Sequence, residues 1–405
     1  MTGVTLTDVE AARERFDESV VQRTPIERSR SLSEMTGAEV ELKMEHLQRT
    51  GSFKTRGASN KIKQVVEAGD AARVVAASAG NHAQGVALAA TTAGVDATIV
   101  MPENAPQAKV DATREYGATV ELRGRDFQGA MEYAESLTEA DDTAFVHAYD
   151  DPAIVAGQGT IGLEIHEQLP DVDTVVVPIG GGGLIGGASA ALAELDPEIR
   201  VVGVQAEQAA TVPESLDKGI PASIDSPKTI ADGIATGGIS ELTLGLIDDH
   251  VDEVVTVSDD EIARAELVLL ERAKQLVEAA GASSVAALLS SDLDVADETV
   301  VPVLSGGNID MSMLQTVLTQ ALTERSQLVR LRIRIEDQPG EMTTLSGLIG
   351  DTGANIRTVR HDRAVDDLRV GEAYLVFQVV TNGAGHARTI AESVREAGYE
   401  VERVA

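Results

Sequence analysis

The stretch "TVVVPIGGGGLIGGASAALAEL", Thr174 to Leu195, decides the fold class of this chain. It begins with β-branched residues that are apolar on both faces, continues through four consecutive glycines and ends in an alanine-rich segment of helical character. A strand without polar alternation is typical of a parallel sheet that helices cover on both faces. The stretch therefore predicts a strand, a glycine turn and a helix, which is the repeating unit of a doubly wound α/β fold.

The same order of elements recurs up to about residue 320. "RVVAASAGNHAQGVALAATTAG", Arg73 to Gly94, predicts another strand, glycine turn and helix, with the strand at Val74 to Ala77. Further strands are predicted in "VDATIVMPENAP", "RVVGVQAE" and "TVVPVLSGGNIDMSMLQTVL". Because ligands of doubly wound folds bind beyond the carboxyl ends of the strands, the glycine turns mark the expected site.

The hydrophobic pattern changes near the C-terminal end of the chain. "LVRLRIRIEDQPG", Leu328 to Gly340, alternates apolar and charged residues, which is typical of a strand with one face in water. A helix, two strands, a second helix and a last strand are predicted to follow, so the order is βαββαβ. We therefore predict two domains, a doubly wound α/β domain in residues 1–325 and a small ferredoxin-like domain in residues 328–405.

Acidic residues dominate the charge of the chain. There are 66 Asp and Glu residues against 33 Lys and Arg residues, which gives a formal net charge of -33 and an isoelectric point near 4.5. Such a surface repels polyanions, so the composition argues against nucleic acid and anionic membranes and favours a small-molecule substrate. Aromatic residues make up only 2% of the chain, which argues against a stacking platform for bases.

The absence of cysteine and the N-terminal segment indicate the cellular compartment. Cysteine is absent, which excludes disulfides, thiolate nucleophiles and Cys-ligated zinc. The opening "MTGVTLTDVEAARERF" lacks the apolar core of a signal peptide, and no apolar run reaches the roughly 18 residues of a membrane helix. We expect a cytoplasmic protein.

More than one chemical role fits the glycine turn. Without Cβ atoms, successive backbone amides can converge on a phosphate at the start of the following helix. The same letters satisfy the dinucleotide pattern GxGxxG at Gly181, Gly183 and Gly186, with Glu207 about 21 positions on as a candidate ribose ligand. Close packing of a helix on the sheet is a third explanation. A hydride site or a carbonyl site elsewhere in the chain must decide between them.

One lysine favours the carbonyl site. Lys54 lies in "GSFKTRGA", Gly51 to Ala58, and is one of only eight lysines in the chain. Between Phe53 and small residues, at the start of a predicted helix, its amine is expected to lose part of its hydration. Its pKa would then fall toward the range in which a neutral amine forms a Schiff base. A surface lysine is the alternative reading of this short motif.

Five motifs occur in an order that resembles a known enzyme family. "SFKTRGA", "ASAGNHAQG", "PIGGGGLIGG", "ADGIA" and "LSGGNID" have the order and approximate spacing of the fold type II pyridoxal-phosphate enzymes. Across residues 5–325 the chain resembles their threonine dehydratase (threonine ammonia-lyase) members. This resemblance implies two doubly wound parallel subdomains, pyridoxal 5'-phosphate as the cofactor and a homo-oligomer. It also implies conversion of L-threonine, with L-serine as a second substrate, to an oxo acid and ammonia.

The resemblance assigns roles to individual residues. Lys54 is implied to bind the cofactor as a Schiff base, with Phe53 against the cofactor ring. Asn81 would hydrogen-bond the phenolic oxygen, and Ser305 would face the pyridine nitrogen. The residues implied to cradle the phosphate are Gly181, Gly182, Gly183 and Leu184. The substrate carboxylate would be held by the backbone amides of Ser78, Ala79, Gly80, Asn81 and His82.

Two positions imply elimination rather than another reaction of the same cofactor. A hydroxyl at Ser305 leaves the pyridine ring nearly neutral, which favours elimination over transamination. In the serine racemases the residue after the first serine of the "SAGNH" loop is a serine, whereas here it is Ala79. No second acid or base is then expected on that face of the substrate. Serine dehydratase and serine racemase are the alternatives within this class.

The resemblance leaves a metal site unassigned. Glu207 matches a position near a cation site in relatives, but Thr211 and Pro213 do not complete such a site, so a structural acid is an equal reading. Glu278, in "VEAAGA", matches a position near the cofactor. The histidines show no metal-ligand spacing, and we expect His82 to have a structural role in its turn.

The C-terminal segment resembles a second family. "EDQPGEMTTLSGLIGDTGANI", Glu336 to Ile356, matches the first strand, turn and helix of ACT domains, which often bind amino acids. This resemblance implies allosteric control by a branched-chain amino acid, because 2-oxobutanoate feeds isoleucine biosynthesis. Pairing of subunits without an effector is an equal alternative.

Functions of other classes are also considered. A nicotinamide-dependent dehydrogenase would explain the glycine turn but would leave Lys54 and Ser305 without a role. An inactive amino-acid sensor on the same scaffold would not need every position that contacts the cofactor.

The acidic excess and the shortage of lysine indicate a proteome adapted to high salt, where the Debye length falls to roughly 3 Å near 1 M and self-repulsion is screened. We expect the free energy of unfolding, measured by denaturant titration, to rise from low to molar salt. Equal stability in the two conditions would count against this hypothesis.

Overall fold

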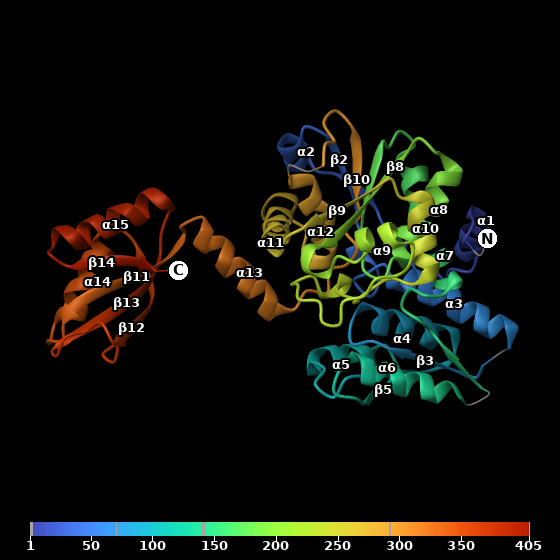
Figure 1. The fold of residues 1–405 in the computed structure, drawn as a ribbon, viewed down its shortest axis with the longest axis horizontal. Helices are drawn as coiled ribbons and strands as arrows, with labels where there is room; N and C mark the ends of the chain where they lie inside the picture. The colour runs from blue at the N-terminus through green and yellow to red at the C-terminus, as the bar shows by residue number, and fades with distance from the viewer. Residues whose placement is uncertain (1–2, 70, 140–141, 291–292, 405) are drawn as a thin grey trace. The chain divides into compact units, whose positions relative to one another are not determined.

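Two sheets with mainly parallel strands build the first unit of the chain, Met1–Asp310 (Figure 1). The computed structural model describes residues 3–69, 71–139, 142–290 and 293–404. The strands of the larger sheet, in spatial order, are β1 (Ile26–Arg28), β2 (Glu39–Lys43), β10 (Thr299–Pro302), β7 (Thr174–Pro178), β8 (Arg200–Ala206) and β9 (Glu253–Val257). Those of the smaller sheet are β5 (Thr119–Leu122), β4 (Asp96–Met101), β3 (Arg73–Ala77) and β6 (Thr143–Phe145). The β1–β2 pair is antiparallel, and the other pairs in both sheets are parallel.

Helices connect these strands and pack on the sheets. They are α1 (Leu6–Glu14), α2 (Arg30–Thr36), α3 (Lys54–Ala68), α4 (Asn81–Ala93), α5 (Gln107–Glu115), α6 (Phe127–Ser136), α7 (Pro152–Gln168), α8 (Gly183–Leu195), α9 (Val212–Lys218), α10 (Glu241–His250), α11 (Asp259–Val268) and α12 (Ala279–Leu289). This alternation confirms the predicted doubly wound α/β fold. In the part of the chain that the structure describes, no helix has the length and apolar character that crossing a membrane requires.

The stretch from Thr174 to Leu195 folds as predicted. Every residue of β7 is buried, the glycines turn the chain, and α8 follows directly. Val176 packs into one hydrophobic core, whereas Val175 and Val177 pack into another. The strand is apolar on both faces because each face is covered by a different layer.

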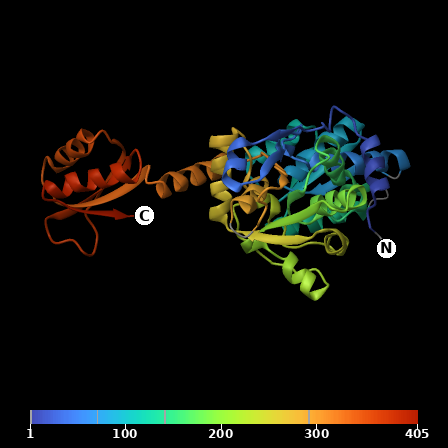
Figure 2. The same ribbon diagram turned by 90° about the horizontal axis from the view of Figure 1, so that it is seen from above.

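The second unit, Met311–Ala405, has one antiparallel sheet. Its elements are α13 (Met311–Glu324), β11 (Leu328–Glu336), α14 (Glu341–Asp351), β12 (Asn355–Asp362), β13 (Glu372–Val380), α15 (Ala384–Glu396) and β14 (Glu400–Val404). The strand order is β12-β13-β11-β14, and α14 and α15 cover one face (Figures 1 and 2). From β11 onward the order is βαββαβ, as predicted. Helix α13 groups with this unit. The domain boundaries expected from the sequence, residues 1–325 and 328–405, stay a prediction.

Glycines allow α3 and α7 to cross at backbone contact. A Cβ atom on Gly157 of α7 would lie 2.6 Å from the Cα atom of Gly57 in α3 and 2.7 Å from the carbonyl oxygen of Arg56. The amide of Gly57 also donates a hydrogen bond to Oε1 of Gln158, at 3.1 Å. Because α3 begins at Lys54, this crossing fixes the segment that carries the lysine motif.

Substitution of Gly157 by alanine tests this crossing. The added methyl group would meet backbone rather than a flexible side chain, so we expect a loss of about 1–3 kcal/mol in the free energy of unfolding, measured in urea. Gly245→Ala is the matched control, because Gly245 lies on the exposed side of α10 with open space at its Cβ position. That substitution should raise the free energy of unfolding by about 0.5–1 kcal/mol. A Gly157→Ala protein as stable as the parent would contradict the close crossing.

Candidate active site

Lys54 is the first residue of α3 and faces the end of the smaller sheet. Its Nζ donates a hydrogen bond to the carbonyl oxygen of Ala148, at 3.0 Å, in the loop after β6. The same Nζ lies 5.1 Å from the ring centroid of Phe53. Burial lowers the pKa of Lys54 to about 8, and the carboxylate of Glu278 acts in the opposite direction. A substantial fraction of this amine is therefore neutral and nucleophilic near physiological pH.

Asn81 is oriented from two sides. It is the first residue of α4, and its Nδ2 donates to Oε1 of Glu278 at 2.7 Å. Its Oδ1 accepts a hydrogen bond from Nδ2 of Asn308, also at 2.7 Å. Because an amide nitrogen carries two hydrogens, one N–H of Asn81 is available for a ligand. Asn308 has a position in the site that the sequence analysis did not assign, although it lies in the quoted motif "LSGGNID".

The turn before α4 presents backbone amides. Ser78, Ala79 and Gly80 join β3 to α4, and no side chain caps the helix at Gly80. Uncapped amides at a helix start carry partial positive charge and suit a carboxylate. His82 is buried, its Nε2 donates to the carbonyl of Val146 at 2.9 Å, and burial lowers its pKa to about 3. A neutral, hydrogen-bonded His82 fits the expected structural role.

The glycine turn between β7 and α8 lies against the same loop that binds the lysine. Gly182 has a φ angle of 85°, in the left-handed region that favours glycine. A Cβ on Gly181 would come within 2.2 Å of the ring of Tyr149, and one on Gly183 within 3.0 Å of its Cβ atom. Tyr149 follows Ala148, whose carbonyl binds Lys54. The glycine turn therefore packs on Tyr149, and the residue before Tyr149 binds Lys54.

The segment after β10 completes the site. Ser305 is buried, and its carbonyl oxygen accepts a hydrogen bond from the amide of Phe53 at 3.2 Å. Ser52 forms an isolated bridge with Gly306, and the carbonyl of Gly306 accepts from the amide of Glu278 at 3.0 Å. The motifs that contain Lys54, Asn81 and Ser305 therefore contact one another, directly or through Glu278, and the glycine motif joins them through Ala148 and Tyr149.

The residues present fit pyridoxal phosphate. Among the described residues, three buried hydroxyls next to the lysine have no hydrogen-bond partner: Thr50 Oγ1, Ser52 Oγ and Thr55 Oγ1. Unpartnered buried polar groups are rare in native proteins and indicate a missing ligand or water. A partly dehydrated amine, a glycine turn at a helix start and an oriented amide are the donors that an aldehyde with a phosphate and a phenolic oxygen requires.

Side chains that could bind a metal ion do not cluster in the described part of the chain. Across residues 3–69, 71–139, 142–290 and 293–404, three or more His, Asp or Glu side chains nowhere gather in a way that could hold an ion. Glu207 is exposed at the start of a short 3₁₀ helix, whereas Thr211 is buried. Glu278 joins the site instead, through Asn81, and burial raises its pKa to about 7.

The pKa of Lys54 can be measured in the cofactor-free full-length chain. We expect the rate of Lys54 acylation, followed by peptide mass spectrometry, to have a midpoint near pH 8. Because the Glu278 carboxylate stabilises the ammonium, Glu278→Gln should move this midpoint to lower pH. Glu10→Gln, at an exposed position on α1, should leave it unchanged. A midpoint near 10.5 in the parent protein would contradict the dehydrated environment.

Comparison with known proteins agrees with this geometry. The family model described as "Pyridoxal-phosphate dependent enzyme" matches residues 18–306. An L-threonine ammonia-lyase from Thermotoga maritima is 46% identical over 401 residues, which covers 99% of this chain and 100% of that protein. Among solved structures, the processed threonine deaminase isoform 2 of Solanum lycopersicum has a TM-score of 0.74 at 36% identity and covers 78% of this chain and 87% of its own. Maize serine racemase has a TM-score of 0.74 at 33% identity, covering 80% and 99%. The chain belongs to the pyridoxal-phosphate-dependent enzyme family, in the group that contains the L-threonine ammonia-lyases.

Proposed function

We propose that this protein is an L-threonine ammonia-lyase that converts L-threonine to 2-oxobutanoate and ammonia, with L-serine as a second substrate. The observation that carries the proposal is the amine of Lys54, which burial partly dehydrates and which binds the carbonyl of Ala148. The next residue, Tyr149, packs on the glycine turn, and the amide of Phe53 binds the carbonyl of Ser305. The full-length similarity to an L-threonine ammonia-lyase supports the same substrate.

The cofactor of this family, when bound, supplies the electron sink that makes the α-proton of an amino acid acidic. Lys54 would hold it covalently and Phe53 would lie against its ring. Asn81 and Ser305 would contact the polar atoms of that ring. The phosphate would be held by the amides of Gly181, Gly182, Gly183 and Leu184.

The side chains and amides of the chain would perform the proton transfers and the positioning. The amides from Ser78 to His82 would bind the carboxylate of the substrate at the start of α4. Once the amino group of the substrate has taken the place of Lys54, the released amine of Lys54 would accept the α-proton. Its lowered pKa makes a larger fraction of it neutral near pH 7 than in an ordinary lysine. The β-hydroxyl would then leave with a proton, and water would release ammonia from the product.

The residue at position 79 favours a lyase over a racemase. A racemase requires a second acid or base on the face of the α-carbon opposite the lysine. The methyl group of Ala79 cannot donate a proton. Serine racemase activity therefore remains the second candidate on the strength of the structural similarity alone.

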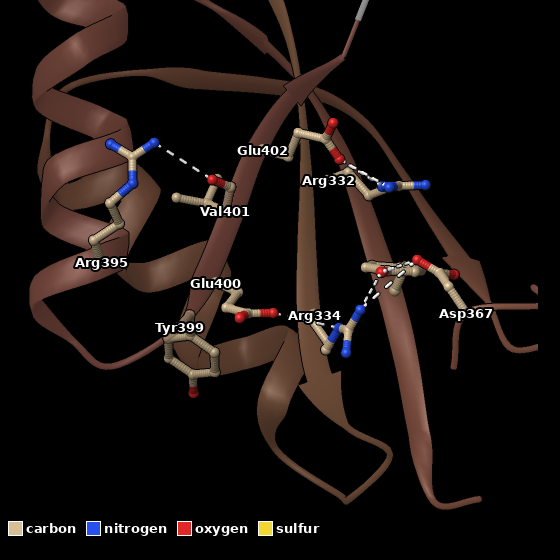
Figure 3. A pocket seen from close by; sticks show the side chains of 9 residues that line it. Arg332, Arg334, Asp367, Arg395, Tyr399, Glu400, Val401 and Glu402 are labelled. Atoms are coloured by element: carbon tan, nitrogen blue, oxygen red, sulfur yellow. Dashed lines mark hydrogen bonds and ion pairs between the residues drawn. The ribbon is translucent and has the colours of Figure 1, made fainter. Parts of the chain in front are cut away.

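The second unit is proposed to be an ACT domain that binds a branched-chain amino acid. A pocket of about 510 Å³ lies in it, next to β11 and β14 (Figure 3). Arg332 pairs with Glu402 at 2.8 Å, and Arg334 lies 3.4 Å from Glu400. The guanidinium groups of Arg332 and Arg334 both lie over the ring of Tyr374. A pocket with both signs of charge suits the carboxylate and the ammonium of an amino acid.

The setting of the enzyme is part of the same proposal. An ammonia-lyase whose product feeds isoleucine biosynthesis is expected in the cytoplasm, as a homo-oligomer, and the acidic surface fits a halophilic proteome. Gel filtration in molar salt would report the oligomeric state, and an elution volume of a single chain would contradict an oligomer.

Replacement of Lys54 tests the proposed function. Lys54→Ala should lower kcat for oxo-acid release from L-threonine by at least about 10³-fold, because both the covalent anchor and the base are lost. Lys63→Ala, on the same helix, should keep kcat within about twofold. The assay uses molar salt and follows oxo acid from threonine and serine, together with D-serine. Parental turnover by Lys54→Ala would overturn the proposal.

Threonine kinetics with and without isoleucine or valine test the regulatory role. We expect an effector to change KM or kcat by about 5-fold or more, the usual range of allosteric coupling. Arg332→Ala should reduce this response while leaving the kinetics without effector unchanged, because Arg332 lies in the second unit. Identical kinetics in all conditions would remove the regulatory hypothesis and leave subunit pairing.

A further inference from the structure

The two largest fully buried side chains of the described structure are cations, Arg56 and Lys43. Both are completely inaccessible to solvent and lie in one cluster with Glu45 and Glu164, which are also buried. The cluster contains two positive and two negative groups and is therefore neutral. Isolated buried charges are costly, so this cluster persists only because its members satisfy one another.

Arg56 is the hub of this cluster. Its Nε and Nη2 donate to the two oxygens of Glu45 at 2.8 and 2.7 Å, and its Nη1 and Nη2 donate to those of Glu164 at 2.7 and 2.9 Å. Nη1 also donates to the hydroxyl of Thr160, at 3.1 Å. All five N–H groups of the guanidinium are thus used. Burial opposes the charge of Arg56, but the two carboxylates outweigh burial and raise its pKa.

Lys43 shares one carboxylate with Arg56 but touches a different part of the fold. Its Nζ donates to Oε2 of Glu164 at 2.6 Å, to the carbonyl of Thr24 at 2.9 Å and to Oε1 of Gln168 at 3.2 Å. None of these three partners lies on α3. Arg56 therefore connects the cluster to α3, and Lys43 connects it to β2.

Arg56 lies in the same helical turn as Lys54, so the cluster can affect the position of the lysine. Arg56 lies two residues after Lys54, so the two side chains leave the helix about 200° apart, on opposite sides of its first turn. The start of α3 has no side-chain cap at Phe53, and an uncapped first turn frays unless other contacts hold it. The forked ion pairs of Arg56 supply such contacts, on the face away from the site.

Neighbouring contacts act on the same turn. A Cβ on Gly85 of α4 would lie 3.0 Å from the carbonyl carbon of Lys54, so α4 packs directly on the lysine backbone. On the other side, Gly57 crosses α7 next to Arg56. The first turn of α3 is thus enclosed by two helices, α4 and α7.

We propose that Arg56 is a positioning residue for Lys54. The two forked ion pairs of Arg56 hold the first turn of α3, so that the lysine amine stays in the site. This role deepens the proposed function, because it concerns the same lysine. It requires arginine in particular, since a lysine ammonium carries the charge but cannot bridge two carboxylates with paired hydrogen bonds.

The test compares Arg56→Lys with Lys43→Met in the full-length chain. Arg56→Lys keeps the charge of the cluster and loosens α3, whereas Lys43→Met removes a charge from the same cluster without touching α3. Three quantities are measured: the unfolding midpoint in urea, the affinity for pyridoxal phosphate by absorbance titration, and the pH midpoint of Lys54 acylation in the cofactor-free chain.

Both variants should have an unfolding midpoint at a lower urea concentration than the parent protein. Arg56→Lys should also weaken cofactor affinity by 10-fold or more and move the acylation midpoint of Lys54 above its parental value, because a displaced amine regains hydration. Lys43→Met should leave the affinity and the acylation midpoint at parental values. If Arg56→Lys fails to fold, Thr160→Val, which deletes one hydrogen bond to Arg56, should cause a smaller shift in the same direction.

The proposal is overturned if the Arg56 and Thr160 variants lose stability while Lys54 keeps its parental acylation midpoint and cofactor affinity. It is equally overturned if Lys43→Met shifts Lys54 as much as Arg56→Lys does, since the cluster would then act only through overall stability. These measurements do not use threonine turnover. A parent protein without turnover would refute the proposed function and leave the role of Arg56 to be decided by the acylation profile.

Discussion

The close crossing of α3 and α7 is the contact on which the active site depends. Gly57 and Gly157 bring the two backbones together, and a side chain at either position would separate them. The same crossing places Arg56 of α3 against Thr160 and Glu164 of α7. Because the lysine is the first residue of α3, a helix that was free to shift or rotate would move the amine out of the site.

The electrostatics of the first unit follow from how each charge is buried. Burial lowers the pKa of the Lys54 amine to about 8, and the carboxylate of Glu278 opposes this shift. The guanidinium of Arg56 is more deeply buried but has two carboxylates, so it stays charged. Burial outweighs the carboxylate partner at Lys54, whereas the two carboxylates outweigh burial at Arg56, so the pKa values of these two cations shift in opposite directions.

Few of the acidic side chains of the chain are buried; in the described structure these are Glu45, Glu164 and Glu266. The formal net charge is -33, yet the buried cluster around Arg56 is neutral, and the site contains amides, hydroxyls, one lysine amine and the carboxyl group of Glu278. The excess carboxylates therefore lie mainly on the surface, where salt screens them. In the second unit, arginines and carboxylates on β11 and β14 pair across the sheet, which balances the charge of that face (Figure 3).

The sequence by itself determined the fold class, the alternation of elements and the motifs of the site. Hydrophobic periodicity and glycine turns are local properties, so β7, α8 and the βαββαβ order could be predicted without contacts. The chemical type of the site followed from five motifs in a common order, because "SFKTRGA" and "PIGGGGLIGG" each leave more than one explanation open when taken alone.

Only the tertiary structure decided which side chains meet. The amine of Lys54 binds a carbonyl 94 positions away, and Asn308 orients Asn81 across 227 positions. Arg56 gave no separate signal in its motif, since an arginine two positions after Lys54 is indistinguishable from a surface charge until Glu164 and Glu45 are seen around it. Such pairings depend on how helices pack, and packing is set by the whole chain rather than by any one stretch.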